Sequence, residues 1–254
     1  MSSIFENTAY DGIADFYELW CLGDECYKPS LDFYTKYLAG MQSPMLEAGI
    51  GTGRIAGSLL HDNPEIMITG TDISNEMLKI CAKKYKKFID GKRLRLLRVD
   101  FCSEDFKFPE EFATIYMPFR TIGHIIDSRH IESFFRRVFS SLKRGGIFIF
   151  DHYVFCRQWA ECHNRVSRTM YSNDEINISD FYIYDFEQHI MKCSVNVNDK
   201  TVQNFLFRWF DAEEFRILAE NFGFIVREVL GDFDGRRFSR DSDNQIWILE
   251  KPFT

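Results

Sequence analysis

A glycine-rich run, followed at a fixed distance by an acid, is the strongest chemical signal in the sequence. The run Gly49-Ile50-Gly51-Thr52-Gly53 directly follows the short apolar stretch Met45 to Ala48, and Asp72 lies twenty-one positions after Gly51. Glycines let the backbone approach a ligand closely, and the helix that follows aims free amides at it. An acid at this distance, at the end of the next strand, can accept both hydroxyls of a ribose. The spacing therefore predicts a nucleoside cofactor.

The glycine pattern by itself does not say which nucleoside is bound. The segment Gly51-Thr52-Gly53-Arg54-Ile55-Ala56 also fits the dinucleotide pattern that ends in alanine. A lone pattern of this kind is weak, so a nicotinamide or flavin cofactor stays open at this point.

Short apolar strands and amphipathic helices alternate between residues 45 and 150. Strands without polar alternation imply a parallel sheet covered on both faces. The expected strands are Met45 to Ala48, Ile66 to Thr71, Leu94 to Val99, Thr114 to Met117 and Ile147 to Phe150. Helices are expected around Leu31 to Leu38, after Gly53 through Leu60, from Ser74 (as cap) to Phe88, and from Ile131 to Leu142, where Lys143 and Arg144 follow.

The pattern changes after residue 150. Alternating, β-branched and aromatic segments occur at Ser179 to Gln188, Ile190 to Val197 and Val202 to Trp209, and Asn198-Asp199-Lys200 is typical of a hairpin turn. A helix from Asp211 to Phe222 and strands Phe224 to Leu230 and Gln245 to Glu250 complete the chain. We therefore expect one domain over residues 1–254 that carries an antiparallel β insert, residues 160–210, over the active site.

The N-terminal residues show a helical period. Tyr10, Ile13, Ala14 and Tyr17 recur at i, i+3, i+4 and i+7, which predicts one face of an amphipathic helix. We expect residues 1–40 to form a helical lid that closes over the ligand and excludes water.

Three features together resemble the class I S-adenosylmethionine-dependent methyltransferases. They are the segment Glu47-Ala48-Gly49-Ile50-Gly51-Thr52-Gly53, the pair Asp100-Phe101 after the third strand, and the order of five alternating strands, helix, strand, strand. The resemblance covers roughly residues 43 to 251. It implies a Rossmann-like α/β fold, a seven-stranded mixed sheet flanked by helices with its last strand antiparallel, and S-adenosylmethionine as cofactor. The cofactor contacts that it implies are Glu47, Gly49, Gly51, Gly53, Asp72, Ile73, Asp100 and Phe101.

Within that family the chain is similar to small-molecule methyltransferases of the glycine and amino-sugar N-methyltransferase type. The similarity lies in the segment from Tyr10 to Tyr17, in the stretch from Met117 to His124, and in the β insert. It implies that Tyr10 contacts the cofactor from the lid and that Met117 lies against the adenosyl portion. The sequence Asp151-His152-Tyr153 departs from the aspartate-aromatic-asparagine-proline sequence of close relatives.

Methyl transfer from a sulfonium is an in-line displacement, so the protein must align the nucleophile and accept a proton if the nucleophile holds one. His124 and His152 follow the fourth and fifth strands, whose ends face the methyl, and are the candidate bases. Tyr153 is a further catalytic candidate. Tyr17, Arg120 and Asp151 are expected on the substrate side, Arg120 as partner of an acidic group. The predicted function is methylation of an N or O atom of a small metabolite. Methylation of RNA, or S-adenosylmethionine binding without catalysis, are the alternatives.

Charge and cysteine content bear on partners and location. The formal net charge is −7, which disfavours a nucleic-acid partner, although basic residues cluster between Lys79 and Arg98. We interpret that cluster as the solvated face of a helix and the following strand. An odd count of seven cysteines, no signal-peptide pattern at Met1 to Tyr10 and no membrane-spanning stretch predict a cytoplasmic protein with free thiols. The stretch from His152 through Cys156, Cys162 and His163 lacks the spacing of a metal site, so no metal is expected. We expect a monomer or homodimer.

Overall fold

A twisted seven-stranded sheet forms the centre of the computed structural model, which describes residues 10–103, 106, 108 and 110–253. Its strand order is β10-β11-β5-β4-β1-β2-β3. The strands are β1 (Met45–Ala48), β2 (Ile68–Asp72), β3 (Leu94–Arg98), β4 (Phe112–Met117), β5 (Leu142–Tyr153), β10 (Ile225–Leu230) and β11 (Asn244–Glu250). Strands β1 to β5 are parallel, and β11 runs antiparallel to both β5 and β10. The predicted mixed sheet with an antiparallel last strand is confirmed.

The strand order reverses between β1 and β4. From β1 the chain builds outward through β2 and β3, then returns to add β4 and β5 on the other side of β1. In such sheets the loops at the carboxyl ends of the two central strands diverge, and they leave a crevice for a ligand. Every residue of β1 and β4 is buried, as expected for strands that are covered on both faces.

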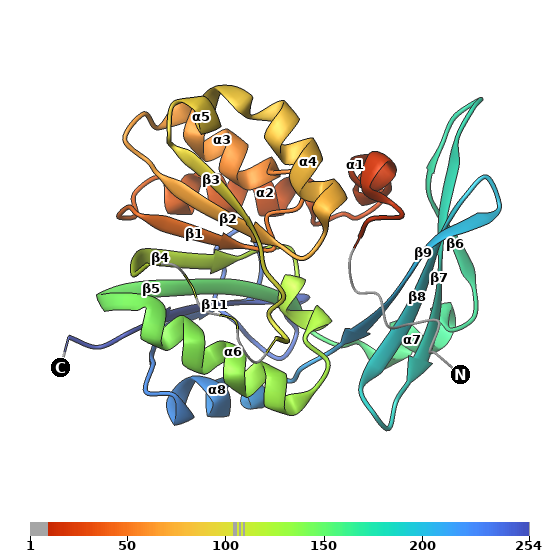
Figure 1. Ribbon diagram of the computed structural model, residues 1–254. Coiled ribbons are helices and arrows are strands. Elements are labelled where there is room, and N and C mark those ends of the chain that lie inside the picture. The colour runs from red at the N-terminus through yellow and green to blue at the C-terminus, as the bar shows by residue number, and fades with distance from the viewer. Residues whose placement is uncertain (1–9, 104–105, 107, 109, 254) are drawn as a thin grey trace.

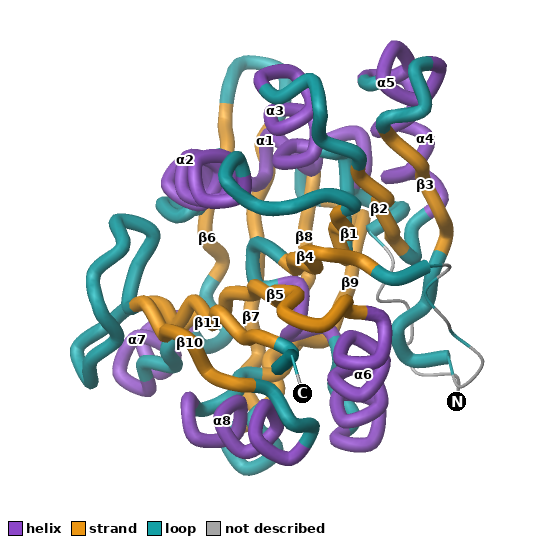
Figure 2. The backbone as a smooth tube through the Cα atoms, turned by 90° about the vertical axis from the view of Figure 1, so that its left-hand side faces the viewer, coloured by secondary structure: helices purple, strands orange, loops and turns teal. Residues whose placement is uncertain are grey.

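Helices cover the two faces of the sheet (Figures 1 and 2). One face packs against α2 and α3, and the opposite face against α6 and α8 through a cluster rich in phenylalanine. The helices of this domain are α2 (Tyr27–Leu38), α3 (Arg54–Asp62), α4 (Asn75–Lys84), α5 (Lys86–Asp90), α6 (Ser128–Ser141) and α8 (Ala212–Asn221), with a 3-10 helix η2 (Thr121–His124). The Ser74 side chain accepts a hydrogen bond from the amide of Met77 and caps α4, as predicted. No helix in the described ranges is both long and apolar enough to cross a membrane.

A separate four-stranded antiparallel sheet follows β5. It is a meander of β6 (Ser167–Ser172), β7 (Asn177–Asp185), β8 (Ile190–Val197) and β9 (Lys200–Arg208), preceded by the helix α7 (Arg157–His163). The predicted hairpin turn is present. Asn198 and Asp199 both have positive φ, 49° and 63°, as two-residue turns between twisted strands require. Strand β6 and helix α7 were not predicted.

The N-terminal segment, residues 10–26, lies between this insert sheet and the central domain (Figure 1). The prediction of one amphipathic helix from Tyr10 to Tyr17 is wrong. The chain makes a turn, a 3-10 helix η1 (Ala14–Phe16) and then the short helix α1 (Tyr17–Cys21). Residues 1–9 of the expected lid lie outside the described residues.

Tertiary hydrogen bonds explain why the helical period fails here. A carboxylate oxygen of Asp11 accepts bonds from the Ser74 hydroxyl and the Glu76 amide, at 2.5 and 3.2 Å, and so adds a second cap to α4. The amide of Gly12 donates to Oε1 of Gln203 on β9 at 3.1 Å. These bonds hold the chain in a turn that a continuous helix could not make, and the local propensity is overridden.

Contacts on both sides fix the N-terminal segment. Oε1 of Glu18 accepts bonds from the Thr52 hydroxyl, 2.7 Å away, and from Nζ of Lys84, 2.5 Å away. On the other side, a Cβ atom at Gly12 would collide with the carbonyl oxygen of Val202, and one at Gly23 with the backbone of Met170. The segment therefore connects the glycine-rich loop to the insert sheet.

We predict that Gly12→Ala loosens this connection. The added methyl group meets backbone rather than a flexible side chain, and overpacking of this kind costs about 1–3 kcal/mol. Limited proteolysis should show faster cleavage within residues 10–26 than in the unaltered protein. Gly40→Ala is the matched control, because a Cβ atom there has no heavy atom within 4 Å. Equal cleavage rates for all three proteins would contradict the tight contact with β9.

Candidate active site

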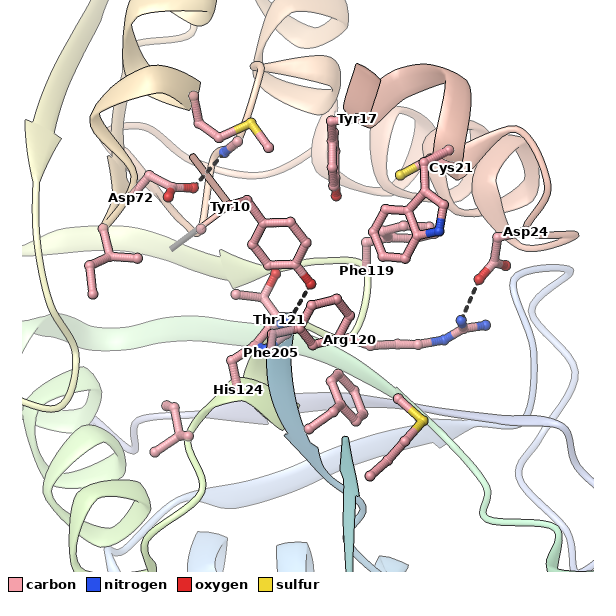
Figure 3. A pocket seen from close by; sticks show the side chains of 18 of the residues that line it. Tyr10, Tyr17, Cys21, Asp24, Asp72, Phe119, Arg120, Thr121, His124 and Phe205 are labelled. Carbon is pink, nitrogen blue, oxygen red and sulfur yellow. Dashed lines mark hydrogen bonds and ion pairs between the residues drawn. The ribbon is translucent and has the colours of Figure 1, made fainter. Parts of the chain in front are cut away.

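A cavity opens at the carboxyl ends of all five parallel strands, beneath the N-terminal segment and the insert sheet (Figure 3). Its empty volume is about 1250 Å³, the open mouth included. The sheet side supplies Gly49, Gly51, Asp72, Ile73, Met77, Asp100, Phe101, Cys102, Phe119, Arg120, Thr121, His124, Ile125 and Tyr153, and the covering side supplies Tyr10, Tyr17, Trp20, Cys21, Asp24, Arg168, Met170, Tyr182, Met191, Phe205 and Phe207.

The glycine-rich loop forms one end of the cavity. Gly49, Gly51 and Gly53 have φ values of 77°, 55° and 83°, which favour glycine. A Cβ atom at Gly49 would collide with the Thr121 side chain. At Gly51 a Cβ atom would meet nothing within 4 Å, so the backbone there is open to an approaching ligand.

Asp72 lies at the end of β2 beside this loop. Its Oδ2 accepts a bond from the Gly51 amide and its Oδ1 from the Ser74 amide, at 2.8 and 2.9 Å. Desolvation by burial raises the pKa of Asp72, and the backbone donors oppose that shift. The carboxylate is thus oriented by the loop that it faces, and Ile73 lines the cavity next to it.

Asp100 and Phe101 line the cavity at the end of β3. The Phe101 ring packs edge-on against Phe134 of α6, with centroids 5.2 Å apart. An acid and an aromatic ring thus lie one strand beyond Asp72, in the order that a nucleoside needs for its ribose and base. The residues present fit the nucleoside cofactor that the sequence predicts.

Three of the expected cofactor contacts do not line the cavity, and this corrects the prediction. Glu47 is buried beneath the loop, where Oε2 accepts bonds from the Ala56 amide and the Tyr116 hydroxyl, at 3.1 and 3.0 Å. Burial raises the pKa of Glu47 to about 8. Gly53 faces Cys81 and Tyr85, and Met117 lies in the core between the sheet and α6. Glu47 and Met117 lie on strands that are covered on both faces, and Gly53 packs against α4 at the start of α3, so these residues support the site from below.

Tyr10 and His124 meet across the cavity (Figure 3). Nδ1 of His124 lies 3.1 Å from the carbonyl oxygen of Leu206, so it must carry the proton. Nε2 then accepts a hydrogen bond from the Tyr10 hydroxyl at 2.7 Å. Desolvation by burial lowers the pKa of His124 to about 4. His124 is therefore a neutral imidazole that anchors Tyr10.

His152 does not reach the cavity, which corrects its prediction as a base. It lies within β5, which extends to Tyr153 rather than ending at Phe150. Tyr153 lines the cavity, whereas His152 has no exposed surface and packs against Phe207, Phe210 and Phe215. Its Nε2 accepts a bond from the Phe210 amide at 3.3 Å, and burial lowers its pKa to about 3.

Asp151 is also buried away from the cavity, although it was predicted to bind substrate. It accepts hydrogen bonds from the amides of Phe119 and Arg120 and from the Tyr34 hydroxyl, at 2.7, 3.0 and 2.6 Å. Phe119 and Arg120 have φ values of 56° and 63°, a conformation that side chains other than glycine rarely adopt. The Asp151 carboxylate therefore holds a strained turn that directs both side chains into the cavity.

The remaining predicted residues line the cavity. Nη1 of Arg120 pairs with Oδ2 of Asp24 at 2.6 Å, and Tyr17 packs edge-on against Tyr10, with centroids 5.6 Å apart. The Tyr153 hydroxyl is buried and has no hydrogen-bond partner among the described residues. The sequence analysis missed Trp20 and the lining residues of the insert, Arg168, Met170, Tyr182, Met191, Phe205 and Phe207. Alternation along the insert strands shows that one face is covered, but not what it faces.

The two buried histidines predict a specific pH dependence of stability. A histidine whose pKa is lowered on folding binds its proton only in the unfolded chain, so it destabilises the fold as the pH falls below about 6.5. Each contributes a loss of about 1.4 kcal/mol per pH unit until its folded pKa is reached. His152→Gln should lower the slope of unfolding free energy against pH by that amount between pH 6 and 4, measured in urea.

His61→Gln is the control for this measurement. His61 is exposed on α3, with 70% of its side-chain area accessible, so this variant makes the same substitution without removing a buried imidazole. A wild-type slope in His152→Gln would show that His152 is protonated in the folded protein.

Comparisons with known proteins agree with the site geometry. Residues 45–146 match the family described as "Methyltransferase domain". No curated protein sequence matches the chain. Among solved structures, an S-adenosylmethionine-dependent methyltransferase from Clostridium acetobutylicum is 18% identical with a TM-score of 0.78, over 96% of this chain and 99% of its own.

Two further solved structures share the fold over nearly the whole chain. The CcbJ methyltransferase from Streptomyces caelestis is 19% identical with a TM-score of 0.79, over 95% of this chain and 97% of its own. CalS10, an amino pentose methyltransferase from Micromonospora echinaspora with bound S-adenosylmethionine, is 14% identical with a TM-score of 0.65, over 97% and 99%. The family match and the site together confirm the predicted cofactor, S-adenosylmethionine. The chain therefore carries a methyltransferase domain that includes residues 45–146, and it has the fold of solved S-adenosylmethionine-dependent methyltransferases.

Proposed function

We propose that this enzyme methylates a nitrogen atom of a small molecule, rather than an oxygen atom. The observation that carries the proposal is the state of His124, the histidine that lines the cavity. It is neutral, its pKa is lowered to about 4, and its Nε2 is occupied by the Tyr10 hydroxyl. A hydroxyl acceptor needs a positioned base of much higher pKa, whereas a neutral amine already carries its lone pair.

The walls of the cavity support an amine acceptor. When bound, S-adenosylmethionine would supply a methyl group from its sulfonium, which leaves a neutral thioether and places the positive charge on the acceptor nitrogen. One wall is a cluster of aromatic rings from Tyr10, Tyr17, Trp20 and Phe205. In the ring pairs that pack together, the ring centroids lie at most 6.2 Å apart. Aromatic faces stabilise a nearby cation by about 0.5–2 kcal/mol each, so this wall favours the ammonium product. The amino pentose methyltransferase CalS10, which shares the fold, is consistent with this choice.

A small acceptor is favoured over a nucleic acid. The basic residues from Lys79 to Arg98 lie on α4, α5, β3 and the turn between α5 and β3, and none of them lines the cavity. Lys79, Lys84 and Lys86 pair with acids. We therefore interpret the cluster as a solvated surface. All seven cysteines are free thiols, which supports a reducing compartment such as the cytoplasm.

Two groups of cavity residues have different roles in aligning the cofactor and the acceptor. We assign cofactor binding to the glycine-rich loop, Asp72, Ile73, Asp100 and Phe101, and closure of the site to Tyr10 and Tyr17. Closure excludes water and holds the reacting atoms in line, which supplies most of the acceleration for an amine.

The assignment of Asp72 to cofactor binding can be tested by substitution. Asp72→Ala removes the carboxylate next to the open backbone at Gly51, and charge-assisted bonds of this kind contribute about 1.5–3 kcal/mol each. Affinity for S-adenosylmethionine should fall about tenfold to hundredfold or somewhat more, measured by calorimetry. Ser74→Ala, which alters the cap of α4 but keeps the acid, should have a smaller effect. Equal affinity for Asp72→Ala and the unaltered protein would remove the assignment.

Substitution of His124 distinguishes a nitrogen acceptor from an oxygen acceptor. Methyl turnover is first screened over small amines and hydroxyl compounds, and His124→Asn is then compared with the unaltered enzyme by single turnover, so that product release does not mask chemistry. For an amine we expect the rate constant at saturation to stay within about tenfold, because no proton is transferred to the imidazole. A loss of about 10²–10⁴ would show general-base catalysis and overturn the nitrogen assignment. Tyr10→Phe, which keeps the ring but removes the hydroxyl, controls for the loss of the anchor.

A further inference from the structure

Two buried hydrogen-bond donors point to a ligand group that the cofactor-binding residues do not explain. They are Nε of Arg120 and the hydroxyl of Tyr153, and both lack a partner among the described residues, as does the indole Nε1 of Trp20 on the covering side of the cavity. Leaving a buried donor unpaired costs about 1–3 kcal/mol, and native proteins seldom do so without a reason. Both residues line the cavity, so a bound ligand can supply the missing acceptors.

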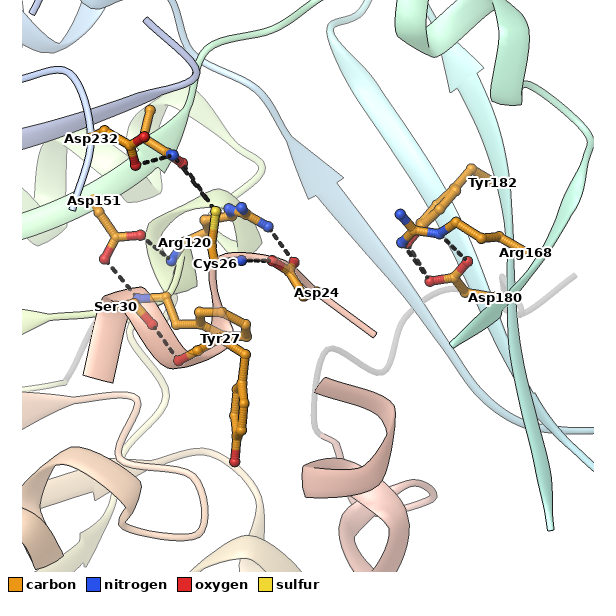
Figure 4. Close-up of polar contacts among 12 residues, drawn as sticks. Asp24, Cys26, Tyr27, Ser30, Arg120, Asp151, Arg168, Asp180, Tyr182 and Asp232 are labelled. Atoms are coloured by element: carbon orange, nitrogen blue, oxygen red, sulfur yellow. Dashed lines mark hydrogen bonds and ion pairs between the residues drawn. The ribbon is translucent and has the colours of Figure 1, made fainter. Parts of the chain in front are cut away.

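The two donors belong to one place in the cavity. The guanidinium carbon of Arg120 lies 5.9 Å from the centre of the Tyr153 ring. Arg120 is fixed from behind, because Asp151 accepts its amide and Asp24 binds its Nη1 (Figure 4). Tyr153 is the last residue of β5, where it pairs with Asn244 of β11. Neither side chain can move far to find another partner.

The order of strands assigns this place to the methyl acceptor. The cofactor-binding residues Gly51, Asp72 and Asp100 follow β1, β2 and β3, on one side of the strand-order reversal. Arg120 and Tyr153 follow β4 and end β5, on the other side. A group that reaches Tyr153 therefore lies across the crevice from the nucleoside.

We propose that Arg120 and Tyr153 form a subsite for a carboxylate of the methyl acceptor, so that the substrate is a small amine that also carries a carboxylate. Arg120 can only donate, so the ligand group must accept. A carboxylate offers one oxygen to each donor, and such charge-assisted bonds are about twice as strong as neutral ones. This inference rests on the proposed function, because it describes the substrate of the same site.

The neighbouring charges leave room for this anion. Asp24 binds Nη1 of Arg120 but leaves Nε free for a ligand. The carboxylate oxygens of Asp151 already accept hydrogen bonds from Phe119, Arg120 and Tyr34. On the opposite wall, Arg168 of the insert sheet binds Asp180 through Nε and Nη2 (Figure 4). Tyr182 donates to the same aspartate, at 2.5 Å. Its phenol is thus already satisfied, in contrast to that of Tyr153.

The test uses acetate as the probe and the full chain loaded with S-adenosylhomocysteine. The Nε–H resonances of the arginines are followed in proton–nitrogen spectra, with that of Arg120 assigned by its loss in Arg120→Lys. Acetate should shift the Arg120 resonance saturably, with a millimolar dissociation constant. Tyr153→Phe should weaken acetate binding about threefold to tenfold, whereas Tyr182→Phe, the same change in the same cavity, should leave it within about twofold.

Three results would overturn the subsite. Acetamide shifting the resonance as strongly as acetate would show that the group is a neutral oxygen. No saturable shift with acetate would show that the donors serve no carboxylate. The third result would show that the donors bind the carboxylate of the cofactor itself. In that case S-adenosylhomocysteine alone would shift the Arg120 resonance and block acetate binding, whereas its decarboxylated analogue would do neither. Failure of S-adenosylhomocysteine to bind at all would instead count against the proposed function.

Discussion

The buried carboxylate of Asp151 is the interaction on which the acceptor side of the site depends. It lies within β5, with no exposed surface, and accepts hydrogen bonds from the turn after β4 and from Tyr34 of α2. Burying a carboxylate is costly, and desolvation raises the pKa of Asp151, so these three donors are needed to keep it in place. In return they stabilise two successive left-handed residues, Phe119 and Arg120, whose side chains would otherwise not face the cavity. One buried acid thus joins two strands and a helix and sets the direction of the substrate-side residues.

The two histidines near the cavity, His124 and His152, differ in whether their side chains reach it. His124 lines the cavity from η2 and is held by hydrogen bonds to Leu206 and Tyr10. His152 precedes the cavity-lining Tyr153 on β5 and packs against Phe215 of α8. Both have a lowered pKa because burial disfavours the charged imidazole. Neither is poised to remove a proton at neutral pH, and this is why the site suits an acceptor that needs no base.

The cavity has two halves that the N-terminal segment joins, in addition to the direct contacts of β9 with His124 of η2 and His152 of β5. The central sheet supplies the loop ends, and the aromatic wall comes from Tyr10, Tyr17 and Trp20 of the N-terminal segment together with Phe205 of the insert sheet. The segment binds α4 through Asp11, the glycine-rich loop through Glu18 and β9 through Gly12. Tyr10, Tyr17 and Trp20 of the same segment line the cavity, so the segment that contacts both sheets also forms part of the site.

The sequence by itself determined the parts of this protein that depend on local chemistry. Strand and helix periods between residues 45 and 150, the glycine-rich loop, Asp72 at its distance and the Asn198-Asp199 turn are set by backbone sterics and by burial on both faces, and the structure has them. Only the tertiary structure decided where β5 ends and which of Asp151, His152 and Tyr153 lines the cavity, because a strand's length depends on its partner β11 and the burial of each side chain depends on the helices and loops packed against it. It also replaced the expected helix at Tyr10 by a turn, since bonds to Ser74 and Gln203 outweigh a local period. The insert residues could not be placed in advance, because a strand pattern shows that one face is buried but not against which ligand or segment it packs.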